Sequence, residues 1–254
     1  MEGFKSFFDD AENRYKNNGS KLIGFRFARD IYGFCINGGK SDNQALEMAK
    51  NIDESIYNRF VSQPKGIVGY ENNESEYEKL DDLDSKHILM LTYLFSNNSI
   101  CYNNIVEIGG GFGNMRRLCN NIINCNSWEI VDIPHMSELQ KYYLENELTD
   151  ISSIKFTSAY EYKKNNYDNI DLVIGTHSLS EFSWDIFLDY FNTIVSKAKY
   201  LFIGLNNNCP SPALINKKLN YILENGFTIE KRMDYTELPH GAPVSYILYK
   251  NSLI

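Results

Sequence analysis

A run of glycines with an acid just before it is the part of this sequence best suited to bind a ligand. The segment IVEIGGGFGNMRRL, residues 105–118, holds four of the chain's 16 glycines within five positions. Glycine lets the backbone adopt positive φ and lets a ligand approach the main chain directly. The apolar residues before the run predict a buried strand and those after it predict a helix. This is the layout of a nucleotide-binding βα turn.

The residues of this turn argue against two common nucleotide motifs. Asn114 stands where the dinucleotide fingerprint has its third glycine, and no Lys-Ser or Lys-Thr pair follows as a P-loop requires. Residues 107–113 read ExGxGxG instead, so that an acid, Glu107, ends the predicted strand. An acid there is a poor neighbour for a pyrophosphate and suits a ligand with positive charge. S-adenosylmethionine fits, with its sulfonium and α-ammonium groups.

A second acid occupies a position suited to a ribose. Asp132 stands at the end of the next predicted strand, SWEIVD. An acid there can hydrogen-bond both ribose hydroxyls, and ligands in such folds bind at the carboxyl ends of the strands. The expected cofactor-binding residues are Glu107, Gly109, Gly110, Gly111, Gly113, Asp132 and Ile133.

Methyl transfer to an alcohol needs an aligned acceptor and a base that takes its proton. The segment DLVIGTHSLSEF, residues 171–182, leaves a predicted strand at the same edge and carries His177 and Glu181. We interpret His177 as a candidate general base because histidine titrates in the right range. Glu181 can orient His177 or hold an acceptor hydroxyl. The alternative is a helix cap, in which Ser178 or Ser180 serves the following turn.

Three further residues are candidates for catalysis and acceptor binding. His240, in ELPHGAP between the last two predicted strands, is the third candidate catalytic residue, unless that loop is a turn built on proline and glycine. Arg26 and Arg29 suit the phosphates of an acceptor linked to a nucleotide diphosphate. Surface salt bridges are their alternative role.

The remaining polar residues give weaker signals. Tyr142 and Tyr143 follow Asp132 on a predicted helix, and we expect Tyr143 to face the acceptor. His87 and His135 are interpreted as surface or capping residues. No HxxxH or paired-carboxylate spacing supports a metal site, so no metal is expected.

The pattern from residue 101 onward predicts alternating strands and helices. Strand-like runs occur at 104–108, 128–133, 153–158, 170–174, 199–205 and 244–249, and amphipathic stretches at 113–124, 136–148, 184–197 and 212–224. Alternation of this kind predicts a mostly parallel sheet with helices on both faces. The tail holds two strand candidates with no helix between them, which predicts an antiparallel pair at the end of the sheet.

Residues 1–100 carry helix signals instead. A helix is predicted to start at SDNQ, residues 41–44, and its apolar positions recur from Ala45 to Phe60. A second helix is predicted to begin near Asp84. We therefore expect a helical region at 1–100 that serves as a cap and binds the acceptor, and a cofactor-binding domain at 101–254.

The composition of the chain limits the kinds of molecule that it is expected to bind. The 254 residues carry a net charge of −8, and no basic stripe is present, which argues against nucleic acid. The five cysteines form no CxxC pair and are expected to be reduced thiols. No apolar run is long enough to span a membrane, and no signal peptide is visible. A cytoplasmic location follows as the default, with a small-molecule acceptor as partner and a homodimer as one possible assembly.

Two segments together resemble a known family. VEIGGGFGNMRRL followed by IVDIPHMSELQKYYL is similar to the sugar O-methyltransferases, a branch of the class I S-adenosylmethionine-dependent methyltransferases. The matching motifs are EIGGGFG, then DIP, then LQKYYL, with a polar HSLSE segment further on. The resemblance covers residues 80–190, whereas the N-terminal region and the tail match in layout only.

This resemblance implies a Rossmann-like α/β fold with a seven-stranded sheet whose last strand is antiparallel. It also implies methylation of a sugar or of a nucleotide-linked precursor in polysaccharide or capsule biosynthesis. Carried over by position, Glu107, Gly109, Gly111 and Asp132 bind S-adenosylmethionine. Ser158 and Tyr160 follow the third strand and lie near the adenine.

Three alternatives stay open from the sequence. The acceptor can be an oxygen of a phosphate or phosphoramidate group, which is already ionised and needs mainly positioning. A nicotinamide-dependent oxidoreductase is disfavoured by Glu107 and Asn114. A non-catalytic subunit with a methyltransferase fold is disfavoured by the intact glycine motif.

Overall fold

The structure is a computed structural model in which two compact units interleave along the chain. It describes residues 13, 16–17, 22, 24–27, 41–70, 80–96, 101–206, 211–237 and 242–254. The first unit comprises Met1–Ile100, Gly110–Ile123 and Ile133–Ser152, and the second comprises Cys101–Gly109, Asn124–Asp132 and Ser153–Ile254. We call them the helical unit and the sheet unit. The functional division expected at residue 100 stays a prediction.

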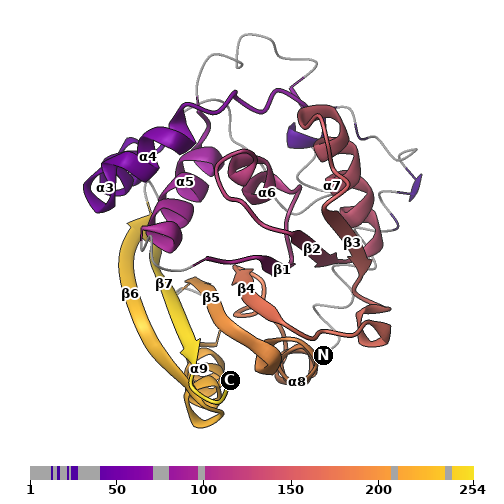
Figure 1. The fold of residues 1–254 in the computed structure, drawn as a ribbon, viewed down its shortest axis with the longest axis vertical. Coiled ribbons are helices and arrows are strands. Elements are labelled where there is room, and N and C mark those ends of the chain that lie inside the picture. The colour runs from indigo at the N-terminus through magenta and orange to yellow at the C-terminus, as the bar shows by residue number, and fades with distance from the viewer. Residues whose placement is uncertain are drawn as a thin grey trace. The chain divides into compact units, whose positions relative to one another are not determined.

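The sheet unit contains one seven-stranded sheet in the order β3-β2-β1-β4-β5-β7-β6 (Figure 1). The strands are β1 (Asn104–Ile108), β2 (Ser127–Asp132), β3 (Ile154–Ser158), β4 (Ile170–Thr176), β5 (Ala198–Asn206), β6 (Phe227–Glu237) and β7 (Ala242–Asn251). Pairing is parallel from β3 through β5, and β7 runs antiparallel to both of its neighbours. The predicted mixed sheet with an antiparallel last strand is confirmed.

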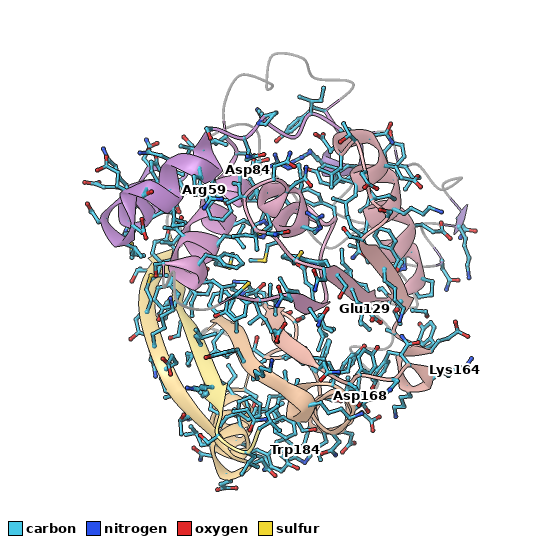
Figure 2. All side chains as sticks on the ribbon, viewed as in Figure 1. Arg59, Asp84, Glu129, Lys164, Asp168 and Trp184 are labelled. Carbon is cyan, nitrogen blue, oxygen red and sulfur yellow. The ribbon has the colours of Figure 1, made fainter. Side chains whose placement is uncertain are left out.

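Apolar strands form the core of this unit. Every residue of β4 except the last is buried, as expected for a central parallel strand covered on both faces. One face of the sheet packs against α8 (Trp184–Thr193) and α9 (Pro212–Glu224), through Phe187 and Ile222 among others. Trp184, labelled in Figure 2, is partly buried against the same core. The short 3-10 turns η3 (Tyr162–Lys164) and η4 (Val195–Lys197) complete the connections.

The helical unit contains η1 (Phe25–Phe27), α3 (Asn43–Ile52), α4 (Glu54–Val61), α5 (Asp82–Phe95), α6 (Asn114–Cys119) and α7 (Pro134–Glu147). The single helix predicted from Ala45 to Phe60 is wrong in one respect, because Asp53 divides it. Asp53 has extended backbone angles, and its side chain accepts a hydrogen bond from the N–H of Ile56, so it caps a new helix. The predicted start is confirmed, with Asp42 as the cap.

The remaining helices of this unit differ from the patterns in length and burial. α5 is buried all round from Ile88 to Phe95. α6 is shorter than predicted because Asn120 adopts an extended conformation. Arg59 of α4, labelled in Figure 2, donates a hydrogen bond to the carbonyl of Ile122 at 2.5 Å, just beyond α6. Among the described helices, none is both long and apolar enough to cross a membrane.

Candidate functional site

The carboxyl ends of four neighbouring parallel strands bring the predicted sheet residues into one row. β3, β2, β1 and β4 are adjacent in that order. Asp132 and Ser158 are direct partners in the register of β2 and β3. Strands lie about 4.8 Å apart, so the row from β3 to β4 is about 15 Å long. This edge is where ligands bind in open parallel sheets.

Glu107 lies near the end of β1 with its side chain buried. Val106 and Ile108 belong to the core beneath α8 and α9, so the alternation of the strand directs Glu107 to the opposite face. There its Oε2 accepts a hydrogen bond from Nε1 of Trp128, at 2.8 Å. The indole therefore orients this carboxylate, a contact that sequence spacing did not reveal.

Gly109 begins the glycine turn in the sheet unit. Its φ is +73°, and its N–H donates to the carbonyl of Val131 at 3.0 Å. A Cβ built on Gly109 would lie 2.6 Å from the Cβ of Ser178 in the loop after β4. Ser178 also donates a hydrogen bond to the carbonyl of Ile108. Close contact between two loops of the carboxyl edge thus requires glycine at this position.

The rest of the glycine turn belongs to the helical unit. Gly111 has φ of +56°, and a Cβ built on it would meet nothing within 4 Å. Its carbonyl accepts a hydrogen bond from Nε2 of Gln140, at 2.9 Å. Gly113 caps α6 and donates its N–H to the carbonyl of Gly110 at 2.9 Å. The bare backbone at Gly111 meets the requirement for a ligand that contacts the main chain directly.

The predicted ribose and adenine residues lie at the ends of β2 and β3. The backbone carbonyl of Asp132 accepts a hydrogen bond from the N–H of Ala159, at 2.7 Å. Ser158 accepts one from the N–H of Tyr160 through its hydroxyl, at 3.2 Å. Tyr160 is 67% exposed, and Ile133 is the half-buried residue before α7. These placements are compatible with the predicted roles, which stay predictions.

His177 is held in an uncommon backbone conformation at the end of β4. Its φ is +55°, which costs about 1–2 kcal/mol for a residue other than glycine. Its N–H donates to the carbonyl of Gly204 at 3.1 Å, and its ring meets that of Tyr246 edge-on at 6.0 Å. Strained backbone that the surrounding structure holds in place is frequent at functional sites.

Glu181 lies on the same turn as His177 and is half-buried. Its N–H donates to the carbonyl of Ser178 at 2.9 Å. Burial raises the pKa of its carboxyl group, and the nearby ammonium of Lys218 lowers that pKa in part. The helix cap considered from the sequence is neither Ser178 nor Ser180, because Ser183 caps α8.

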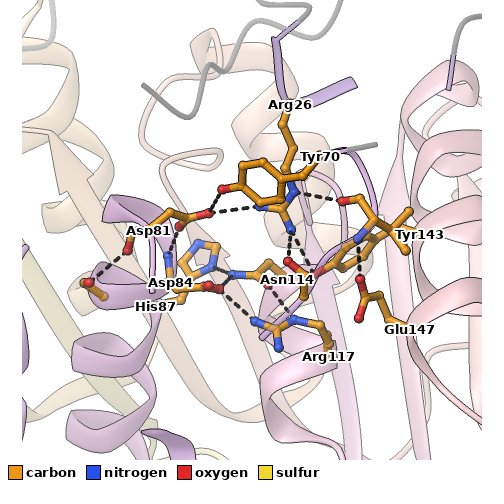
Figure 3. A network of polar contacts seen from close by, with 12 residues as sticks. Arg26, Tyr70, Asp81, Asp84, His87, Asn114, Arg117, Tyr143 and Glu147 are labelled. Carbon is orange, nitrogen blue, oxygen red and sulfur yellow. Dashed lines mark hydrogen bonds and ion pairs between the residues drawn. The ribbon is translucent and has the colours of Figure 1, made fainter. Parts of the chain in front are cut away.

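Arg26 and Tyr143 both lie in the interior of the helical unit. Arg26 is fully buried and its Nη1 forms an ion pair with Asp81 at 2.9 Å (Figure 3). Its other donors contact the carbonyls of Val68 and Gly66 and the hydroxyl of Tyr143. Both side chains are thus hydrogen-bonded in the interior of the helical unit, and their predicted acceptor-binding roles stay predictions.

The same network continues to the first turn of α6. Asn114 donates to Asp84 at 2.9 Å and accepts hydrogen bonds from Arg117 and Tyr143 (Figure 3). Arg117 also forms a buried ion pair with Asp84 at 2.7 Å. Asn114, which replaces the third glycine of the dinucleotide fingerprint, thus forms hydrogen bonds with three buried polar side chains. His87 meets the same Asn114, with 3.0 Å between their nitrogens.

Some predicted residues receive no structural test. Arg29 and His240 lie outside the described residues.

His135, expected at the surface or in a cap, is buried at the start of α7. Within the described ranges, no group of three or more His, Cys, Asp or Glu side chains is arranged to hold a metal ion.

Comparison with solved structures identifies the fold. The chain resembles a candidate RNA methyltransferase from Pyrococcus horikoshii, with a TM-score of 0.54 and 12% identity, covering 83% of this chain and 97% of that one. It also resembles the N-methyltransferase NodS from Bradyrhizobium japonicum WM9 in complex with S-adenosyl-L-homocysteine, with a TM-score of 0.52 and 14% identity, covering 79% and 98%. The methyltransferase domain of bacterial CtHen1 gives a TM-score of 0.53 at 11% identity, covering 64% and 96%.

No family model and no curated protein match the sequence. At these identities the structural likeness establishes the fold alone. The chain has the Rossmann-like fold of the class I methyltransferases, with a seven-stranded, mostly parallel sheet.

Proposed function

We propose that this protein is an S-adenosylmethionine-dependent O-methyltransferase that acts on a sugar or on a nucleotide-linked precursor of a surface glycan. The observation that carries the proposal is the row at the carboxyl edge of the sheet, where Asp132 and Ser158 are direct partners beside β1. The methyltransferase fold and the EIGGGFG, DIP and LQKYYL motifs support it.

The strand ends supply groups of the kinds that this cofactor needs. Asp132 would bind the ribose hydroxyls, with Ser158 and Tyr160 near the adenine, and Ile133 stays a candidate cofactor contact. Glu107, oriented by Trp128, would favour the positively charged end of the cofactor. Backbone from Gly109 to Gly113 would contact the cofactor directly, and the open space at Gly111 suits that role. The bound cofactor supplies a methyl group on a sulfonium, which is a good leaving group.

The chain's own part in the reaction is to align the acceptor and receive its proton. His177 is the candidate general base, at the end of a strand adjacent to β1. Glu181 on the same turn would accept a hydrogen bond from the acceptor hydroxyl or orient His177. His240 stays a candidate catalytic residue, and Arg29 stays a candidate for binding the acceptor.

A small acceptor fits the charge of the chain better than a nucleic acid. One of the structural neighbours, the candidate RNA methyltransferase from Pyrococcus horikoshii, carries RNA in its name. Binding to a phosphate backbone draws on clustered Lys and Arg, whereas this chain has a net charge of −8 and a sequence pI near 5.1. We therefore place the acceptor among small polar molecules.

The test is methyl transfer from isotopically labelled S-adenosylmethionine to a panel of nucleotide sugars, free sugars and their phosphates, followed by mass spectrometry. We expect one labelled methyl group on a hydroxyl of a nucleotide sugar. His177→Ala should lower kcat at least about a hundredfold if the acceptor is a neutral hydroxyl. A modest loss would identify an already ionised phosphate-type oxygen as the acceptor. No transfer to any member by protein that binds the cofactor would contradict the proposed acceptor class.

A further inference from the structure

A buried lysine holds the turn that carries two of the candidate catalytic side chains, His177 and Glu181. Lys218, on α9, is 1% exposed. Its ammonium donates to the carbonyls of Leu179 at 3.1 Å, Ser180 at 2.7 Å and Phe182 at 2.5 Å. A lysine ammonium has three N–H donors, and here all three serve one turn of the backbone.

The same turn also forms hydrogen bonds with β5. The N–H of His177 and the hydroxyl of Ser180 both donate to the carbonyl of Gly204, at 3.1 Å and 3.2 Å. The turn is therefore held from α9 by a charge and from β5 by neutral hydrogen bonds. A buried ammonium is unfavourable unless it is fully hydrogen-bonded, so Lys218 and the conformation of the turn depend on each other.

The charge of the lysine also acts on the Glu181 carboxyl group. In the described part of the chain, Lys218 is the charged group of a packed element that acts on Glu181, and His177 is the titratable neighbour on the same turn. Burial raises the pKa of Glu181, and Lys218 lowers it. Removal of the lysine charge would leave the effect of burial unopposed.

We propose that Lys218 is a positioning residue of the reaction, which fixes the turn from His177 to Phe182 and holds the Glu181 carboxylate ready to accept a hydrogen bond from an acceptor hydroxyl. This inference rests on the proposed function for its role in catalysis. Its structural part stands on the three carbonyl contacts alone.

The test compares Lys218→Met with Lys217→Met in the full-length protein. Lys217 is the next residue of α9, but it is exposed and lies over the ring of Trp184 at 3.8 Å, away from the turn. Carboxyl NMR gives the pKa of Glu181, and amide hydrogen exchange follows the N–H groups of Glu181 and Phe182, which donate to Ser178. Calorimetry with S-adenosylhomocysteine follows cofactor binding separately.

In Lys218→Met we expect the pKa of Glu181 to rise, because burial then acts unopposed, and the two amides to exchange at least about tenfold faster. Affinity for S-adenosylhomocysteine should stay within about twofold, because the proposed ribose contact is on β2. Lys217→Met should match the wild type in all three measurements. If the methionine variant does not fold, Lys218→Gln keeps amide donors without the charge, and it should shift the Glu181 pKa with less effect on exchange.

An unchanged Glu181 pKa together with unchanged amide exchange in a folded Lys218 variant would overturn the inference. A faster exchange with an unchanged pKa would overturn the part that concerns the charge. If the wild type fails to bind S-adenosylhomocysteine, the proposed function fails, whereas the NMR and exchange measurements still decide whether Lys218 holds the turn.

Discussion

Two glycines of the same turn should differ in how alanine affects stability and cofactor binding. Gly109 and Gly111 both have positive φ, at +73° and +56°, so an alanine at either is strained by about 1–2 kcal/mol. Their surroundings differ. A Cβ at Gly109 would lie 2.6 Å from the Cβ of Ser178, which is anchored close to the backbone, whereas a Cβ at Gly111 would meet nothing within 4 Å.

The magnitudes follow from these contacts. At Gly109 the overlap adds about 1–3 kcal/mol of overpacking to the backbone strain, so Gly109→Ala should lower the free energy of unfolding by about 2–5 kcal/mol. At Gly111 only the backbone strain remains, and a less flexible unfolded chain offsets part of it. Gly111→Ala should therefore cost about 1 kcal/mol of stability.

Cofactor affinity should be affected more directly by alanine at Gly111 than by alanine at Gly109. The methyl group at Gly111 would project into the space that we assign to the cofactor, so the Kd for S-adenosylhomocysteine should rise about tenfold or more while the protein stays folded. Urea unfolding and calorimetry on both variants measure the two effects. The reasoning is refuted if Gly109→Ala is as stable as the wild type, or if Gly111→Ala binds S-adenosylhomocysteine with unchanged affinity.

Three further predictions concern buried charge and strain. Arg26→Met leaves Asp81 buried without its ion-pair partner and should cost about 3–5 kcal/mol in urea unfolding, and adding Asp81→Asn should recover part of that loss. Burial alone would raise the pKa of Asp171, but an ammonium and two backbone N–H groups lower it. A folded-state pKa below the unfolded value stabilises at neutral pH and loses its effect as pH falls through the folded value. Asp171→Asn should thus cost about 1–3 kcal/mol near neutral pH, and the difference from the wild type should vanish as the pH falls through the lowered pKa of Asp171. His177→Gly removes the strain of a positive φ but also the ring contact with Tyr246. Its melting temperature should therefore change little, while methyl transfer falls sharply. A large drop in melting temperature would show that the ring holds the turn.

The sheet could be predicted because its signals are local. Strand runs end within two residues of their predicted bounds, since buried parallel strands are continuous apolar runs. The division of the first predicted helix at Asp53 was harder to predict. The apolar residues recur at helical intervals on both sides of Asp53, so the pattern gives no sign of the helix cap between them. The antiparallel tail was readable because no helical pattern separates its two strands.

The site was readable only where the motif is contiguous. Glu107, the glycines and Asp132 are marked by spacing, but the contact between Trp128 and Glu107 joins two strands and leaves no local signal. Lys218 contacts residues 36–39 positions earlier, so no pattern in the sequence could reveal it. The burial of Arg26 could not be predicted, because a buried arginine and a surface arginine look alike in a sequence until Asp81 is seen beside it.

The central claim is that the carboxyl edge of the sheet binds S-adenosylmethionine, and calorimetry with S-adenosylhomocysteine tests it most directly. We predict micromolar binding by the wild type, and binding about ten- to a hundredfold weaker by Asp132→Ala, because charge-assisted hydrogen bonds to the ribose are lost. Asp168→Ala, an exposed acid of the same unit (Figure 2), should bind as the wild type does. Folded wild-type protein that does not bind S-adenosylhomocysteine, or an Asp132→Ala variant that binds it equally well, would contradict the account.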